Sequence, residues 1–91
     1  MASQRRHIRF FGDVQGVGFR YVTCRTAGGF DVTGYVRNLP DSSVECLVEG
    51  EAAEIDAFLA AVCQRMSGHI DRHTQETGAF TGAFQSFDVR F

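Results

Sequence analysis

Apolar residues between positions 55 and 66 recur with the period of an α-helix, and this stripe constrains the fold more than any other feature of the sequence. They follow one another at alternating intervals of three residues and one residue, which places all of them on one helical face. The members of the stripe are Ile55, Phe58, Leu59, Val62, Cys63 and Met66. Glu51 and Glu54 in the first turn and Arg65 in the last complement the helix dipole. Since Gly68 suits a C-terminal cap, we expect a helix over residues 51–66.

Residues 19–30 carry the second helical pattern. Its apolar face repeats every three or four positions and consists of Phe19, Val22, Thr26 and Phe30. Gly28 and Gly29 lie near the end of this segment, where each weakens a helix by roughly 0.5–1 kcal/mol relative to alanine. We therefore expect a helix that frays at the two glycines.

Short β-rich segments account for the rest of the chain. They predict strands over residues 7–14, 32–38, 43–49, 70–76 and 87–91, of which 70–76 has the weakest pattern. In the strand 43–49, Val44, Cys46 and Val48 are expected to face one side of the sheet, with Glu45 and Glu49 on the other. The residues LPDS between the second and third strands have turn chemistry, so these two strands form a hairpin.

The order of these elements is βαββαβ, followed by a short final strand. Right-handed crossovers place both helices on one face of an antiparallel sheet. This is an α+β fold, the ferredoxin-like sandwich. We expect one domain over residues 1–91, with residues 1–4 as a loose N-terminal tail.

Composition excludes several classes of protein. The 91 residues are 44% hydrophobic and 22% charged, with a net charge of −2, which favours neither nucleic acid nor a membrane surface as partner. No apolar run approaches the ~20 residues that span a bilayer, and the N-terminus lacks a secretion signal, so we expect a cytoplasmic monomer.

Histidine and cysteine give no indication of a metal site. On a strand, the Cα atoms of His69 and His73 would lie ~13 Å apart, too far for both side chains to bind one zinc ion. The three cysteines, Cys24, Cys46 and Cys63, are widely spaced and form no C-x-x-C motif. Cys46 and Cys63 stand among apolar residues, where a thiol usually acts as a small hydrophobic side chain.

The glycine-rich stretch GDVQGVGFR connects the first strand to the first helix. Glycine lets several backbone N–H groups turn toward one point, and the helix adds the positive end of its dipole, so such a loop suits a phosphate. Neither G-x-G-x-x-G nor a GK[ST] motif is present, and a plain tight connection remains an alternative. Arg20 favours the phosphate, because a cation in the first helical turn opposes the dipole unless an anion lies between them.

Asn38 ends the second strand, next to the hairpin turn. Its amide both donates and accepts hydrogen bonds, so it can orient a water molecule without ionising. Considered alone, Asn38 has an alternative interpretation as an ordinary turn residue without a functional role.

Three motifs together resemble the acylphosphatases, a family of small ferredoxin-like enzymes. They are GDVQGVGFR, TGYVRNLPD and VECLVEG, supported by the TG pair at 81–82 and the ending FDVRF. The likeness extends from about Ile8 to Phe91, and Arg20 and Asn38 are separated as in the family.

The resemblance implies hydrolysis of the carboxyl-phosphate anhydride bond of small acyl phosphates. In that mechanism Arg20 and the backbone amides of Gln15, Gly16, Val17, Gly18, Phe19 and Arg20 bind the phosphate. Asn38 orients the water that attacks phosphorus in line, and carboxylate leaves. The resemblance implies no metal ion, cofactor or phospho-enzyme.

Two positions depart from the family pattern in ways that bear on stability. Asp31 and Ser42 stand where the family usually has glycine, and both residues tolerate such bends less well. Neither departure affects Arg20 or Asn38.

Other functions of the same fold remain to be weighed. A non-catalytic module that binds acyl or carbamoyl phosphate is the first alternative. An RNA-recognition domain would need aromatic strand patterns and a basic face, whereas strand 43–49 carries acidic residues. A metallochaperone is disfavoured by the absence of C-x-x-C.

Overall fold

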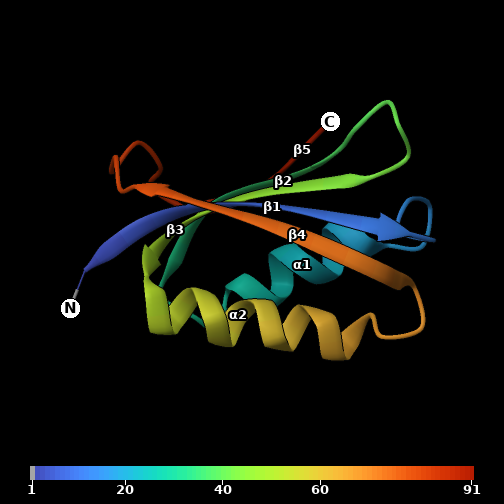
Figure 1. Cartoon of the computed structure of the whole chain (residues 1–91), viewed down its shortest axis with the longest axis horizontal. Helices are drawn as coiled ribbons and strands as arrows, with labels where there is room; N and C mark the ends of the chain where they lie inside the picture. Colours follow the sequence, from blue (N-terminus) through green and yellow to red (C-terminus); the bar gives the residue numbers. More distant parts are fainter. Residues whose placement is uncertain (1) are drawn as a thin grey trace.

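The computed structural model describes residues 2–91, and it places two helices on one face of a five-stranded sheet (Figure 1). The elements follow one another as β1 (Ser3–Gly12), α1 (Phe19–Ala27), β2 (Val32–Asn38), β3 (Val44–Glu51), α2 (Ala52–Arg65), β4 (Ile70–Ala79) and β5 (Phe87–Arg90). The strands lie in the sheet in the order β4-β1-β3-β2-β5. This arrangement confirms the predicted ferredoxin-like fold.

The sheet is mixed, because β5 pairs with β2 in the parallel direction. The pairs β4–β1, β1–β3 and β3–β2 are antiparallel. The predicted antiparallel sheet is therefore confirmed for the first four strands, and the short final strand, for which no direction was predicted, is added in parallel. β4 runs opposite to β2, and the loop after β4 reverses the chain once more, so β5 runs parallel to β2.

β1 and β4 extend furthest beyond the limits that their sequence patterns indicate. β1 begins at Ser3, where Ser3 pairs with Glu51 and Gln4 with Gly50, so the expectation of a loose tail is wrong for these two residues. Met1, which belongs to the same predicted tail, lies outside the described residues. β4 extends to Ala79 as an edge strand whose side chains are almost all exposed, which explains its weak apolar alternation.

Both helices end close to their predicted limits. α1 stops at Ala27, and the two glycines that follow form a turn, as their low helix propensity predicts. Glu51 occupies the N-cap position of α2 without a side-chain capping bond. The C-cap position is Met66, so the cap predicted at Gly68 is wrong. Within residues 2–91, no helix is long and apolar enough to cross a membrane.

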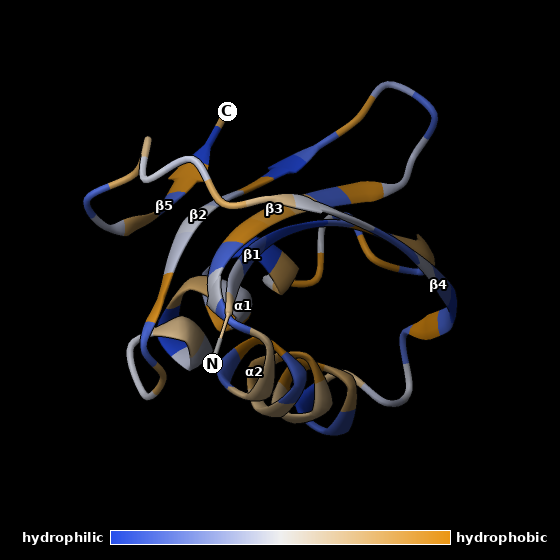
Figure 2. Ribbon diagram, turned by 60° about the vertical axis from the view of Figure 1, so that its left-hand side comes forward, coloured by the Kyte–Doolittle hydropathy of each residue, from blue (hydrophilic) through white to orange (hydrophobic). Residues whose placement is uncertain are grey.

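The core lies between the helices and the face of the sheet that they cover (Figure 2). Every helix and every strand except β4 and β5 contributes buried apolar residues to it. They are Ile8, Phe10, Val14, Phe19, Ala27, Val32, Val36, Val44, Cys46, Val48, Ile55, Phe58, Leu59, Val62 and Met66. Cys46 is fully buried, which raises the pKa of its thiol and confirms it as a small hydrophobic side chain. All three cysteines are free thiols.

Two glutamates of β3 lie on the face of the sheet away from the helices and are nevertheless buried. Glu45 contacts His7 and Arg37, and Glu49, only 1% exposed, accepts four hydrogen bonds. The donors to Glu49 are Nε of Arg5 at 2.7 Å, Oγ1 of Thr81 at 2.7 Å, N of Thr81 at 3.1 Å and N of Gly82 at 2.9 Å. Glu49 thus fixes the loop between β4 and β5 over the sheet.

Replacing Glu49 by glutamine is expected to reduce the free energy of unfolding by roughly 2 kcal/mol at neutral pH, since hydrogen bonds to a charged group are lost. Burial raises the pKa of Glu49, but the bonds from Thr81, Arg5 and Gly82 outweigh it and leave the pKa below its usual value. Stabilisation by a carboxylate with a depressed pKa is present above the unfolded value of about 4.3 and is lost as the pH falls through the folded value.

Urea unfolding of Glu49→Gln and of the unmodified chain at pH 7 and pH 3 measures this difference directly. The gap between the two proteins should narrow at pH 3, because this pH lies below the unfolded pKa of about 4.3 and the unfolded chain is then protonated at position 49. A gap that stays constant between the two pH values would contradict the role given to the carboxylate charge.

The β2–β3 turn holds Ser42 in the left-handed region, with φ of 77°. This conformation costs a residue other than glycine about 1–2 kcal/mol, so the dihedral angle supports the prediction that the departure at Ser42 lowers stability. At Asp31 the expected bend that only glycine tolerates well is absent, so that prediction is wrong. Its φ is not positive, and its backbone amide donates to Oε1 of Glu54 at 2.8 Å.

Replacing Ser42 by glycine is therefore expected to stabilise the chain by about 1 kcal/mol. A higher midpoint of urea unfolding with an unchanged slope would show this. Asp31→Gly serves as the matched control and should lower stability, because Asp31 needs no positive φ and glycine adds entropy to the unfolded chain.

Candidate active site

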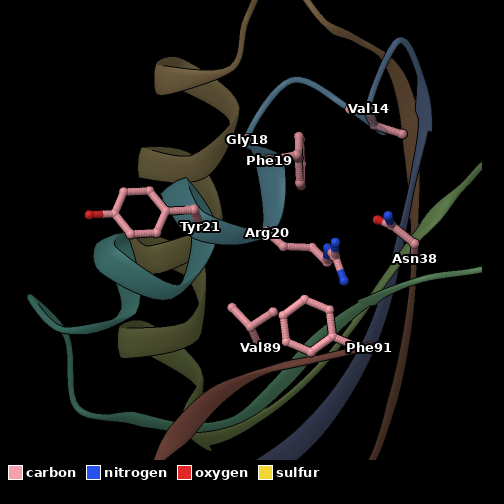
Figure 3. A pocket seen from close by; sticks show the side chains of 9 residues that line it. Val14, Gly18, Phe19, Arg20, Tyr21, Asn38, Val89 and Phe91 are labelled. Carbon is pink, nitrogen blue, oxygen red and sulfur yellow. The ribbon is translucent and has the colours of Figure 1, made fainter.

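A pocket of about 270 Å³ lies where the β1–α1 loop, the start of α1, the end of β2 and the last strand meet (Figure 3). Its size suits a small molecule rather than a drug-sized ligand. The lining residues are Val14, Gly16, Gly18, Phe19, Arg20, Tyr21, Asn38, Val89 and Phe91. Figure 3 shows the guanidinium of Arg20 and the side-chain amide of Asn38 directed toward each other across this space.

Two glycines shape the loop that forms one wall of the pocket. Gly16 and Gly18 both have φ of 77°, a conformation that glycine adopts without steric cost. Gly18 is the N-cap of α1, which has neither a side-chain cap nor an acidic residue in its first turn. Among the hydrogen bonds of residues 2–91, none is donated by a backbone amide of residues 15–20. The loop therefore keeps its N–H groups free beside the positive end of a helix dipole, as an anion site requires.

Arg20 is held in place by the C-terminal segment. Its Nη1 donates to the carbonyl oxygen of Arg90 at 3.1 Å, and its guanidinium lies 4.7 Å from the centre of the Phe91 ring. No carboxylate among the described residues lies within salt-bridge distance of Arg20. Its positive charge is thus fixed in direction and available to an anion.

Asn38 is the last residue of β2 and pairs with Val44 of β3. Its Oδ1 atom is buried and has no hydrogen-bond partner within the described chain. A buried polar atom without a partner costs about 1–3 kcal/mol, so such atoms usually bind a ligand or an ordered water. This oxygen is therefore suited to accept a hydrogen bond from a molecule in the pocket.

The structure brings most of the predicted site residues together. Arg20, Asn38, Gly16, Gly18 and Phe19 line the pocket. Gln15 and Val17 do not line it: the side chain of Val17 packs on the core, and that of Gln15 is directed to the β2–β3 turn.

Sequence reasoning missed four residues of the pocket. Val14 and Tyr21 directly flank the predicted loop, so its boundaries could have been drawn more widely. Val89 and Phe91 reach the pocket because β5 pairs in parallel with β2, where Val89 lies beside Val36. Nothing in the local sequence indicates that pairing. Within residues 2–91, no group of three or more His, Cys, Asp or Glu side chains is arranged to hold a metal ion.

Comparison with known proteins identifies the family. The Acylphosphatase family profile matches residues 6–89. The chain belongs to the acylphosphatase family. The acylphosphatase of Syntrophotalea carbinolica is 38% identical to it over 88 residues, which cover 96% of each chain. Acylphosphatases are enzymes that hydrolyse acyl phosphates, so the resemblance seen in the sequence motifs and the prediction of a hydrolase are confirmed.

Solved structures agree with the acylphosphatase assignment. The crystal structure of acylphosphatase from Bacillus subtilis superposes with a TM-score of 0.86 and 26% identity, covering 97% of this chain and 99% of the other. The crystal structure of HypF from T. kodakarensis gives a TM-score of 0.82 and 32% identity. It matches 97% of this chain but only 12% of HypF, so the acylphosphatase fold also occurs as a small part of a larger protein.

Proposed function

We propose that this acylphosphatase cleaves the carboxyl-phosphate anhydride bond of small acyl phosphates, with Arg20 and the 15–20 loop binding phosphate and Asn38 orienting water. One observation carries the proposal. Within residues 2–91, a cation without a carboxylate partner and a buried oxygen without a hydrogen bond line the same pocket. The products are a carboxylate and inorganic phosphate.

The phosphate is bound by the guanidinium of Arg20 and by the free amides of residues 15–20. The planar guanidinium can donate to two phosphate oxygens at once, and the loop amides surround the others. These donors also face the negative charge that the phosphoryl oxygens carry in the transition state. The chain itself therefore supplies positive charge where phosphoryl transfer requires it.

Asn38 acts on the attacking water. Its Oδ1 accepts a hydrogen bond from the water, which directs the oxygen lone pair toward phosphorus on the side opposite to the leaving carboxylate. The bond from water oxygen to phosphorus forms while the bond from phosphorus to the acyl oxygen breaks, and the proton of the water passes to solvent. A carboxylate is a weak base, so it leaves without a general acid, and alignment supplies most of the catalysis.

The acyl group has an apolar surface available to it. Val89 and Phe91 line the pocket beside Arg20, and their apolar surface suits the organic part of the substrate. The small volume of the pocket favours short acyl chains or a single ring over a large acyl group.

Hydrolysis of benzoyl phosphate by the purified chain tests this proposal. We expect turnover that inorganic phosphate inhibits competitively and that EDTA leaves unchanged. Arginine is charged throughout the neutral range and asparagine does not titrate, so kcat should vary little between about pH 6 and 8. A bell-shaped dependence of kcat on pH in this range would contradict the mechanism. So would a loss of activity in EDTA that zinc or magnesium restores.

A non-catalytic phosphate-binding module is the second candidate. It is favoured by the match to a small part of HypF, where the same fold forms part of a larger protein. The same experiment decides between the two, because a binding module takes up inorganic phosphate but leaves benzoyl phosphate intact.

A further inference from the structure

The side chain of Gln15 is directed away from the pocket and toward the β2–β3 turn. Its Nε2 donates to the carbonyl oxygen of Leu39 at 2.8 Å and to that of Ser43 at 2.9 Å. Both acceptors are backbone atoms, so the amide group of Gln15 connects one backbone segment to another. A primary amide nitrogen has two N–H groups, and two carbonyl acceptors use both of them.

The two carbonyl groups lie next to Asn38 in the β2–β3 hairpin. Leu39 follows Asn38 directly, and Ser43 precedes Val44, the register partner of Asn38. The amide of Leu39 also donates to the carbonyl of Ser43 at 2.9 Å, which closes the turn. Gln15 therefore binds the part of the hairpin that determines where Asn38 lies.

At its other end, Gln15 belongs to the phosphate-binding loop. Its backbone precedes Gly16, which lines the pocket together with Gly18 and Arg20. Across the described chain, the two bonds from the Gln15 side chain are the hydrogen bonds that join residues 13–18 to residues 39–43. The loop has a second support at Asp13, which lies 3.5 Å from His69, but that contact is on the α2–β4 side.

We propose that Gln15 is a positioning residue, whose side chain sets the distance between the phosphate-binding loop and Asn38. This inference rests on the proposed function, in which the loop holds phosphorus and Asn38 holds the water. A misplacement of one reacting group by 1 Å costs about 100-fold in rate. In the proposed function, phosphate affinity depends on Arg20 and the backbone amides of the loop. Replacing the Gln15 side chain keeps its backbone amide, so it changes turnover and leaves phosphate binding intact.

The chemistry of the site requires glutamine. Asparagine is one methylene shorter, methionine has no N–H group, and a glutamate carboxylate would place an acceptor against two acceptors. Protonation of such a glutamate restores one O–H donor. Gln15→Glu should therefore gain activity as the solution is acidified, whereas the unmodified chain should not.

The test compares Gln15→Glu and Gln15→Met with the unmodified chain and with Gln64→Glu. Gln64 is exposed on α2, so Gln64→Glu makes the same change of charge away from the pocket. For both Gln15 variants we expect kcat with benzoyl phosphate to fall about 100-fold, with the inhibition constant of inorganic phosphate unchanged within about twofold. Gln64→Glu should match the unmodified chain.

Thermal unfolding, followed by circular dichroism, accompanies the kinetics. If Gln15→Glu fails to fold, Gln15→Met decides. Unchanged kcat in a folded variant overturns the inference, as does loss of phosphate affinity or of the fold in both variants. An unmodified chain that binds phosphate without hydrolysing benzoyl phosphate overturns the proposed function, and positioning by Gln15 with it. Normal turnover in the unmodified chain together with normal kcat in the Gln15 variants overturns the Gln15 inference alone.

Discussion

Substituting lysine for Arg20 is expected to lower kcat/KM for benzoyl phosphate about 1,000-fold, although the positive charge is retained. The carbonyl of Arg90 and the ring of Phe91 fix the plane of the guanidinium, and that plane directs its remaining N–H groups. Lysine has no plane to fix and presents a single ammonium group, so it cannot donate to two phosphate oxygens in a defined geometry.

Steady-state kinetics with benzoyl phosphate and inhibition by inorganic phosphate together measure the effect of Arg20→Lys. Both substrate turnover and phosphate affinity should fall, because in the proposed mechanism the same guanidinium binds the phosphate in the ground state and the transition state. Arg72→Lys is the control, since Arg72 lies on the exposed edge strand and stacks on Phe11. Nearly full activity in Arg20→Lys would show that only a point charge is needed.

Asn38→Ala is expected to reduce kcat between about 100-fold and 1,000-fold, the usual cost of removing one well-placed polar group from such a site. The inhibition constant of inorganic phosphate should stay the same, since Asn38 contacts the water and not the phosphate in the proposed mechanism. The fold should also survive, because the Oδ1 atom that is lost makes no hydrogen bond to any of residues 2–91.

Single-turnover and steady-state measurements on Asn38→Ala, with the unfolding free energy measured in parallel, check this result. Asn38→Asp is a second test. The side-chain shape is retained, but a carboxylate in the pocket should repel inorganic phosphate and so raise its inhibition constant. Equal losses of turnover and phosphate affinity in Asn38→Ala would assign Asn38 to substrate binding instead.

Local patterns predict the parts of this fold that local residues determine. The apolar stripe of α2, the glycines that end α1 and the turn between β2 and β3 could all be located in this way. Burial of Glu49 could not, because it depends on the loop that returns over the sheet from β4. The length of β4 could not be predicted from the sequence either, because an exposed edge strand needs no apolar alternation.

In the candidate site, too, the residues set by local sequence could be predicted, and those set by tertiary contacts could not. Arg20 and Asn38 could be selected because each has an unusual chemical position, in a first helical turn and at a strand end. Phe91 could not, because its contact with Arg20 depends on the parallel pairing of β5 with β2. The side-chain bonds of Gln15 to Leu39 and Ser43 likewise arise from tertiary structure.

The contact between Arg20 and the last strand has a consequence for how the chain folds. The side chain of Arg20 is fixed in direction only after β5 has paired with β2. β5 follows β4 in the sequence, and β4 pairs Ala79 with Gln4, two residues far apart along the chain. Contacts so distant in sequence form slowly, because loop closure must precede them. During refolding from urea, we therefore expect helical circular dichroism to recover before hydrolytic activity, which reports the final assembly of the sheet.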